Sequence, residues 1–180
     1  MNNNPVSEVY LMDCVAGMKE YPDKFFDLAI CDPPYGIGAS ASFGHYWDST
    51  KGKAASNGVR NINKQWDFEK PDYQYFIELF RVSKNQIVWG GNYFTDKLPV
   101  SRSWICYDKK QPEANSFGKF ELGWTSFDKI SLKFEYYPTH VTQGKRIHPT
   151  QKPVALYEWL LKNYASKGDK ILDTHLGSGS

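Results

Sequence analysis

Hydrophobic residues gather along this chain in short runs that predict buried β-strands. The clearest run covers residues 26–31, and it ends at two prolines, Pro33 and Pro34, that cannot continue a strand. A second run, at residues 86–89, is closed by two glycines. By the same criteria we expect further strands at residues 7–12, 103–107, 120–127 and 170–173.

Between these runs, apolar residues recur at the spacing of helices. Phe76 and Phe80 fall on one face of a helix that we predict for residues 72–83. Another helix follows Pro153, and a short one is predicted for residues 14–21. Strands that alternate with helices indicate an α/β fold, with a mainly parallel, twisted sheet and helices on both of its faces. In such sheets, ligands bind beyond the carboxyl ends of the strands.

The composition fits a single domain that covers residues 1–180. Hydrophobic residues make up 41% of the chain and charged residues 23%, which is enough for a core and excludes an intrinsically disordered chain. The aromatic share of 16% fits a well-filled core, or rings that stack on unpaired bases. The three cysteines have no metal-binding or redox spacing. Without a leader peptide or a membrane-length apolar run, we expect a soluble protein of the cytoplasm.

Positive charge is concentrated in one long polar segment, residues 36–66, that lacks hydrophobic periodicity. The whole chain has a net charge of only +2, yet this segment holds four basic residues and one acid, Asp48. Long loops inside compact domains are usually functional or mobile, although a solvated flexible loop would have a similar composition. We predict a mobile loop whose basic residues contact nucleic-acid phosphates and whose tryptophan braces it: Lys51, Lys53, Arg60, Lys64 and Trp66.

The first candidate for chemistry is Asp32-Pro33-Pro34-Tyr35, directly after the strand at residues 26–31. The prolines remove backbone donors and fix the chain, which leaves a carboxylate, bare carbonyl oxygens and an aromatic ring. Acceptors of this kind can polarise an exocyclic amine and stabilise the positive charge that develops on it. Tyr35 could stack on a base turned out of a duplex. A plain Pro-Pro turn with an aspartate cap is the competing interpretation.

Two further motifs have the chemistry of ligand binding. His148, Thr150 and Lys152 crowd the loop that leads through Pro153 into the last helix, where a carboxylate would be bound well. An ordinary helix start explains only the proline. After residues 170–173, a glycine pair would let backbone approach a nucleotide, although a tight turn is the commoner explanation. The residues of this second motif are Asp173, Thr174, His175, Gly177, Ser178 and Gly179.

Together and in this order, the motifs closely resemble those of DNA amino-methyltransferases of the permuted beta class. In that family the Asp-Pro-Pro-Tyr catalytic motif comes early and the glycine-rich cofactor motif late. The stretch at residues 87–94 is typical of phage and bacterial members, and the resemblance covers nearly the whole chain. It implies a circularly permuted, Rossmann-like methyltransferase fold, S-adenosylmethionine as cofactor and duplex DNA as partner.

The resemblance also implies roles for individual residues. Asp32, Pro33, Pro34 and Tyr35 correspond to the catalytic motif. Asp13 corresponds to the acidic residue that contacts the adenine of the cofactor. Cofactor binding is implied as well for a larger set: Asp32, His148, Thr150, Lys152, Asp173, His175, Gly177, Ser178 and Gly179.

We therefore predict direct transfer of a methyl group to the amino group of a flipped-out adenine, with no covalent intermediate and no nucleophilic role for Cys31. An aspartate at the start of the catalytic motif favours adenine, and the same chemistry on cytosine is an alternative. A catalytically silent DNA-binding relic is another. Target recognition is predicted for residues 108–147, whose lysines could equally be exposed, solubilising residues.

The chain departs from the family pattern in two places. Thr174 and His175 follow Asp173, where the family has Pro-Phe, although a histidine still supplies a flat ring. The family continues beyond its glycine motif with a helix, a strand and an acidic residue that binds ribose, and this sequence has no residues after Ser180. We therefore expect a fold that is incomplete at its C-terminal end.

Overall fold

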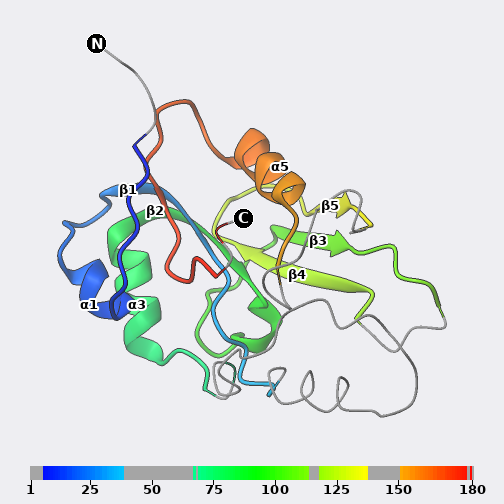
Figure 1. Cartoon of the computed structure of the whole chain (residues 1–180), viewed down its shortest axis with the longest axis horizontal. Helices are drawn as coiled ribbons and strands as arrows, with labels where there is room; N and C mark the ends of the chain where they lie inside the picture. Colours follow the sequence, from blue (N-terminus) through cyan, green and yellow to red (C-terminus); the bar gives the residue numbers. More distant parts are fainter. Residues whose placement is uncertain are drawn as a thin grey trace.

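The computed structural model describes residues 6–38, 67, 69–113, 118–137, 151–177 and 179. The helices in these ranges are α1 (Cys14–Lys19), α3 (Tyr73–Val82), the short 3-10 helix η1 (Gly91–Tyr93) and α5 (Val154–Tyr164) (Figure 1). The strands are β1 (Phe26–Cys31), β2 (Ser83–Trp89), β3 (Trp104–Asp108), β4 (Phe120–Thr125), β5 (Leu132–Glu135) and β6 (Ile171–Leu172). None of these helices is long and apolar enough to cross a lipid bilayer.

The described strands form one six-stranded sheet in the order β5-β3-β4-β2-β1-β6. β1 lies between β2 and β6 and is parallel to both, with Cys31 opposite Val88 and Ala29 opposite Leu172. β4 is antiparallel to β2 and β3, while β5 is parallel to β3. The predicted mainly parallel sheet is therefore confirmed. Because β1, β2 and β6 are parallel, the residues that follow them meet at one edge of the sheet.

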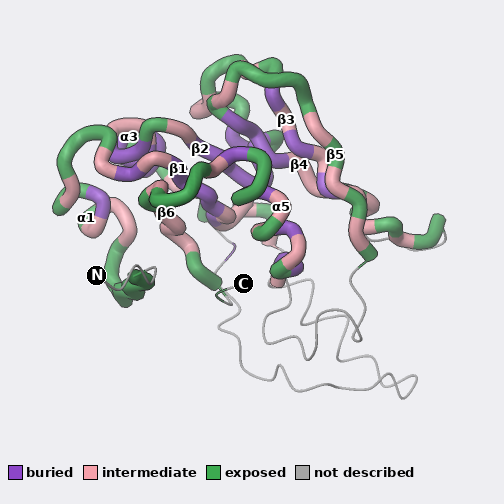
Figure 2. The backbone as a smooth tube through the Cα atoms, turned by 90° about the horizontal axis from the view of Figure 1, so that it is seen from above, coloured by how far each residue is buried: buried purple, intermediate pink, exposed green. Residues whose placement is uncertain are grey.

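Side chains alternate between the two faces of β1, as the geometry of a strand requires. Ala29 and Cys31 belong to a core that includes residues of α1 and α3, whereas Leu28 and Ile30 belong to a second core with α5. All four are buried, and buried segments run along β1 and β2 through the middle of the fold (Figure 2). The predicted helices on both faces are confirmed. This double cover fixes the segment that follows β1.

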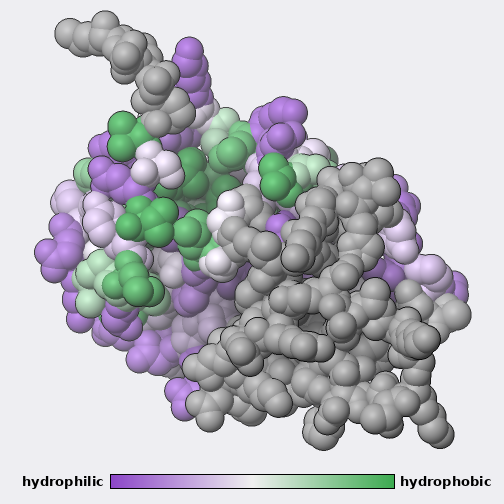
Figure 3. All heavy atoms as spheres, in the orientation of Figure 1, coloured by the Kyte–Doolittle hydropathy of each residue, from purple (hydrophilic) through white to green (hydrophobic). Residues whose placement is uncertain are grey.

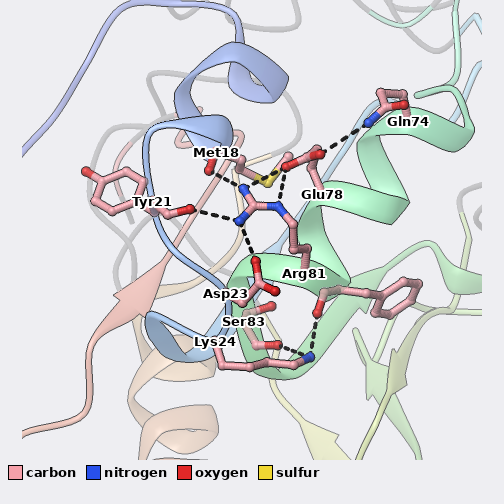
Figure 4. A network of polar contacts seen from close by, with 9 residues as sticks. Met18, Tyr21, Asp23, Lys24, Gln74, Glu78, Arg81 and Ser83 are labelled. Carbon is pink, nitrogen blue, oxygen red and sulfur yellow. Dashed lines mark hydrogen bonds and ion pairs between the residues drawn. The ribbon is translucent and has the colours of Figure 1, made fainter.

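One arginine ties the two helices of the first face together (Figure 4). The guanidinium of Arg81, in the last turn of α3, donates to the carbonyl oxygens of Met18 and Tyr21, at 3.0 and 2.9 Å. It also pairs with the carboxylates of Glu78 and Asp23. Met18 lies in the last turn of α1 and Tyr21 lies two residues beyond its end, so Arg81 joins the end of α1 to α3. The two helices are thereby fixed as a pair against the sheet.

Two elements differ from the prediction. Residues 7–12, which we predicted as a strand, form none, and they pair with no strand in the described part of the chain. Val9 and Leu11 are largely exposed there, and apolar side chains gather on the face where this segment and β6 lie (Figure 3). An apolar run becomes a strand only where a partner strand is available. β5 was not predicted, because its alternation of two apolar and two charged residues is short.

Candidate active site

The predicted catalytic and cofactor motifs meet at the carboxyl edge of the three parallel strands. Asp32 follows β1, Gly90 follows β2 and Asp173 follows β6. The two aspartates influence each other electrostatically. Burial, and then repulsion by the Asp32 carboxylate, raise the pKa of Asp173 to about 6. The motifs are 141 residues apart in sequence, counted from Asp32 to Asp173, and the sheet brings them to one place.

The turn after β1 is held by a residue outside the catalytic motif. Its two prolines have no backbone N–H, so the first donors after Asp32 are those of Tyr35 and Gly36. Both donate to the same carboxylate oxygen of Asp67, at 2.7 and 3.1 Å. Asp67 is only 1% exposed, and these charge-assisted bonds offset the cost of burying its carboxylate. The backbone of Tyr35 is thereby fixed.

The ring of Tyr35 lies between two other segments of this edge. It stacks on Tyr93, with 5.1 Å between the ring centroids and 18° between the planes. It also lies against Gly90, where a Cβ atom would come within 2.2 Å of Tyr35 Cε1. The hydroxyl donates to Oδ1 of Asp32 at 2.6 Å. Burial raises the pKa of Tyr35 well above its usual value, so the phenol stays neutral and remains a donor.

A buried lysine contacts the second oxygen of Asp32. Lys152 Nζ lies 2.5 Å from Asp32 Oδ2 and 3.2 Å from Glu121 Oε2, and 5.4 Å from the centroid of the Trp89 ring. Burial alone would lower the pKa of Lys152, but the carboxylates of Asp32 and Glu121 raise it well above its usual value. The lysine is therefore charged, and each oxygen of Asp32 has its own donor.

Glu121, on β4, is the other carboxylate that contacts this lysine. Its second oxygen pairs with Lys109 at 2.5 Å. Burial acts to raise the pKa of Glu121, but the charges of Lys152 and Lys109 outweigh burial and lower this pKa to about 2. Four groups of alternating sign thus lie in a row: Lys109, Glu121, Lys152 and Asp32.

The segment after β6 is a hydrogen-bonded turn. The backbone N–H of His175 donates to Asp173 Oδ1 at 2.9 Å, and His175 Nδ1 lies 2.9 Å from Thr174 Oγ1. Thr174 Oγ1 is in turn 2.8 Å from the hydroxyl of Tyr75 on α3. Burial lowers the pKa of His175 to about 4, so its ring is neutral at physiological pH. The departure from the family pattern therefore does supply a flat, uncharged ring.

The glycines of this segment leave space of the kind that the predicted cofactor needs. Gly177 and Gly179 both have a left-handed φ, of +57° and +68°. A Cβ atom on Gly177 would lie 3.7 Å from the carbonyl oxygen of His175, and one on Gly179 would meet no atom of the described residues within 4 Å. The carboxylate of Asp173 is half-buried beside them and can pair with an ammonium group. A carboxylate next to an open glycine turn fits a nucleoside that carries an amino acid.

Asp13, the predicted contact to the adenine of the cofactor, lies at the start of α1. Its carboxylate accepts a hydrogen bond from the backbone N–H of Ala16 at 2.8 Å and so caps the helix. The adenine contact stays a prediction.

Several predicted site residues lie outside the described residues, and their roles also stay predictions. They are His148, Thr150 and Ser178 of the cofactor set, and Lys51, Lys53, Arg60, Lys64 and Trp66 of the DNA-binding set. Of the predicted loop at residues 36–66, only residues 36–38 are described. The range predicted for target recognition, residues 108–147, supplies β4 and β5 to the sheet, and its role in recognition stays a prediction.

Sequence analysis missed two residues that build this site, Asp67 and Glu121. Asp67 comes directly after a long polar segment, and no pattern there distinguishes it from a solvated aspartate. Glu121 lies between Phe120 and Leu122 inside a predicted strand, where alternation predicts a charged side chain on the solvent face, so nothing in the sequence marks it as part of the site.

Known proteins match this chain over most of its length. A family model described as DNA methylase, for N6 and N4 methyltransferases, matches residues 60–180, more than half of the chain. The type II methyltransferase M.HpaI of Haemophilus parainfluenzae is 24% identical to this chain. The alignment covers 93% of the chain and 63% of that protein. The type II methyltransferase M2.MboI of Moraxella bovis is 25% identical, over an alignment that covers 96% of the chain and 76% of that protein. The chain thus spans just under two thirds of the length of M.HpaI.

A solved structure also resembles this fold. TTHA0409, a proposed DNA modification methylase of Thermus thermophilus, matches 91% of the chain and 77% of its own length with a TM-score of 0.49 and 13% identity.

Proposed function

Because the chain belongs to the N6/N4 family of DNA methylases, we propose that it transfers a methyl group from S-adenosylmethionine to the exocyclic amino group of an adenine flipped out of duplex DNA. The observation that carries this proposal is the carboxylate of Asp32 at the end of β1, held by a donor on each of its oxygens. The open glycine turn after β6 lies at the same edge of the sheet. An acceptor for an amine is thus next to a segment suited to the cofactor.

The chemical task is to make a poor nucleophile react. The lone pair of an exocyclic amine is delocalised into the base, and positive charge develops on the nitrogen as it gains a methyl group. We assign the carboxylate of Asp32 and the carbonyl oxygen of Pro33 to the amine hydrogens, because both follow directly on β1. Tyr35 and Lys152 fix the orientation of Asp32 before any substrate binds, so this acceptor needs no reorganisation during the reaction.

Aromatic rings beside Asp32 are suited to a base that has left the stack. We assign this role to Tyr35 together with Tyr93, on which it stacks. The flipped base would bring its amine to Asp32 while its ring contacts this pair. Flipping frees the amine from its base pair and brings the base out of the stack into a pocket of the enzyme.

Cofactor binding is assigned to the segment after β6. S-adenosylmethionine, when bound, supplies a methyl group that its sulfonium centre activates. Asp173, His175, Gly177 and Gly179 are the described residues that we expect to hold it, with Asp13 at its adenine. Lys152 was predicted to contact the carboxylate of the cofactor. Since its ammonium already pairs with Asp32 and Glu121, we assign Lys152 to Asp32 instead.

The burial of the Cys31 thiol supports an exocyclic amine, rather than a ring carbon, as the group that is methylated. Although it precedes Asp32, the thiol is fully buried, and burial raises its pKa to about 12. A protonated, buried thiol cannot attack a base, so a covalent route through this cysteine is closed. Direct transfer to nitrogen needs no such attack.

Sequencing with modified-base detection tests the function on DNA from cells that express this chain. We expect N6-methyladenine at one recurring sequence, and none in cells that express Asp32→Ala. N4-methylcytosine at a recurring sequence would reassign the base, since the preference for adenine rests on the aspartate that opens the motif. Absence of both modifications in cells that hold folded protein would contradict the proposal.

DNA contact is proposed for the basic loop at residues 36–66, with target recognition by residues 108–147. Support for the loop comes from its excess of basic residues: Lys51, Lys53, Arg60 and Lys64, with Trp66 beside them. Affinity for duplex DNA should fall as the salt concentration rises, and the slope should become smaller when these lysines are neutralised. Binding without salt dependence would remove the phosphate contacts from the proposal.

A further inference from the structure

The ammonium of Lys152 is shared between two carboxylates that belong to different parts of the fold. Asp32 follows β1, Glu121 lies on β4, and Lys152 precedes α5. The lysine itself is 6% exposed. Burying an ammonium costs several kcal/mol, roughly, unless charges and hydrogen bonds compensate it, so an arrangement with one lysine and two carboxylates needs a reason.

We propose that Glu121 is a positioning residue for methyl transfer, which holds the ammonium of Lys152 against the carboxylate of Asp32 and keeps the group as a whole negatively charged. This inference rests on the proposed function. Glu121 has no role in any motif of the sequence, and it acts on the reaction through Lys152.

The orientation of the Asp32 carboxylate depends on where the Lys152 ammonium is held. Asp32 has Tyr35 on Oδ1 and Lys152 on Oδ2, so its plane depends on the position of the lysine. The long side chain of Lys152 would have several rotamers if Asp32 alone held it. Glu121 contacts the ammonium as a second carboxylate, and the Trp89 ring lies 5.4 Å from it. Lys109 holds Glu121 in turn.

The charge of Glu121 also acts at the proposed reaction site. An ion pair formed by Asp32 and Lys152 alone would be neutral, and the lysine would cancel the negative charge that Asp32 offers to the developing cation. With Glu121 included, two carboxylates face one ammonium, and one net negative charge remains. Lys109 pairs with the other oxygen of Glu121, so in this row of ion pairs it is the group furthest removed from Asp32 and its charge acts there most weakly. The group can therefore fix Asp32 and still stabilise positive charge on the amine.

Glu121 also helps to keep Lys152 protonated. The groups that interact with it electrostatically are Asp32, Glu121, Tyr35, Tyr157 and Asp173. Burial raises the pKa of both tyrosines well above the usual value, so neither carries charge near neutral pH. Asp173, with a pKa of about 6, is half ionised at that pH and fully ionised by about pH 8. If Glu121 lost its charge, burial would lower the pKa of Lys152, and above about pH 8 it would be the one group of this set that titrates as a result.

The first measurement is independent of catalysis. The full chain is labelled with ¹³C at lysine Cε, the Lys152 signal is assigned from its absence in Lys152→Arg, and its shift is followed with pH. In wild type we expect no titration up to about pH 10. In Glu121→Gln we expect a midpoint at least one pH unit lower, roughly. Asp27→Asn is the matched control, because this partly exposed aspartate on β1 also pairs with a lysine, Lys84, and lies outside the proposed site and DNA-binding segments. The same titration in Glu121→Gln as in wild type would overturn the proposal.

The second measurement is single-turnover methyl transfer to duplex DNA. Glu121→Gln should slow transfer by about 10- to 100-fold, with affinities for S-adenosylmethionine and DNA within about threefold of wild type. Its rate should also fall at alkaline pH, where the wild-type rate stays level. Asp27→Asn should match wild type. If wild type is active and Glu121→Gln transfers the methyl group at the same rate, the proposal is overturned.

Two further outcomes are distinguishable. If wild type transfers no methyl group, the proposed function fails, and the lysine titration alone decides the placement of the ammonium. If Glu121→Gln does not fold, Glu121→Asp replaces it. This variant keeps the charge with a shorter reach, so we expect a level alkaline profile and a rate reduced severalfold. A Glu121→Asp rate equal to that of wild type would contradict the positioning role.

Discussion

Gly90 and Tyr35 fit together so closely that the glycine position can hold no side chain. A Cβ atom there would lie 2.2 Å from Cε1 of Tyr35, and the backbone of Gly90 has a φ of +66°. This contact joins the end of β2 to the turn after β1. Because the Tyr35 hydroxyl donates to Asp32, the position of the proposed catalytic carboxylate depends on a glycine of the neighbouring strand.

Gly90→Ala is therefore expected to displace the ring of Tyr35 and to slow methyl transfer by at least about tenfold, because Asp32 loses a fixed donor. Left-handed strain and the clash together should lower stability by about 1–3 kcal/mol, measured by denaturant unfolding. Gly168→Ala is the control, since Gly168 also has a positive φ, +95°, but its Cβ would meet no atom of the described residues within 4 Å. An equal loss of activity in both variants would mean that backbone strain, and not the Tyr35 contact, is responsible.

Asp173 makes the stability of the unliganded protein depend on pH. Its pKa in the fold, about 6, lies above the ordinary value of 3.8, because burial and Asp32 disfavour the charged form. Protonation of Asp173 contributes to the free energy of unfolding. This contribution is fully present below about pH 4 and is lost as the pH rises to about 6. Asp173→Asn cannot ionise, so it should be more stable than wild type by about 3 kcal/mol above pH 6, and by far less near pH 4.

Denaturant unfolding of Asp173→Asn and wild type across this range checks the expectation. A gain in stability that is the same at both ends of the range would contradict it, as would no gain at neutral pH. If Asp173 binds the cofactor as proposed, the same variant should bind S-adenosylmethionine more weakly, because the carboxylate assigned to the ammonium group of the cofactor is removed.

Arg81 is expected to stabilise the fold without taking part in chemistry. Arg81→Met removes hydrogen bonds to the carbonyl oxygens of Met18 and Tyr21 and ion pairs with two carboxylates. The melting temperature should fall by several degrees, roughly, while kcat at a permissive temperature stays near that of wild type. Arg102→Met is the control, because its one ion pair, with Asp128, is largely exposed and contributes little. Equal melting temperatures for the two variants would contradict this account of Arg81.

Much of the fold could be predicted from local pattern. The buried run at residues 26–31 matches β1 residue for residue, and the helix predicted for residues 72–83 matches α3 to within one residue at each end. Residues 7–12 have a similar apolar content, but strand formation there depended on a neighbouring strand that local sequence cannot reveal. The start of β2 at Ser83, directly after α3, left no turn signal either.

The candidate site could be predicted only where it consists of continuous motifs. Asp32, Tyr35 and Asp173 stood out because each follows an apolar run, and the parallel strands then bring them together. Asp67 contacts the backbone of Tyr35, 32 residues earlier in the sequence, and Glu121 contacts the ammonium of Lys152, 31 residues later. Such contacts depend on tertiary structure, so composition and spacing gave no sign of them.

The central claim is that Asp32 holds the exocyclic amine that receives the methyl group. The most direct test incubates duplex DNA with purified protein and S-adenosylmethionine that carries a deuterated methyl group, followed by mass analysis of the nucleosides. Wild type should yield N6-(trideuteromethyl)adenine, and Asp32→Ala should yield at least about 100-fold less while DNA affinity is largely kept. Near-normal turnover in Asp32→Ala, or a labelled C5 of cytosine in wild type, would contradict the account.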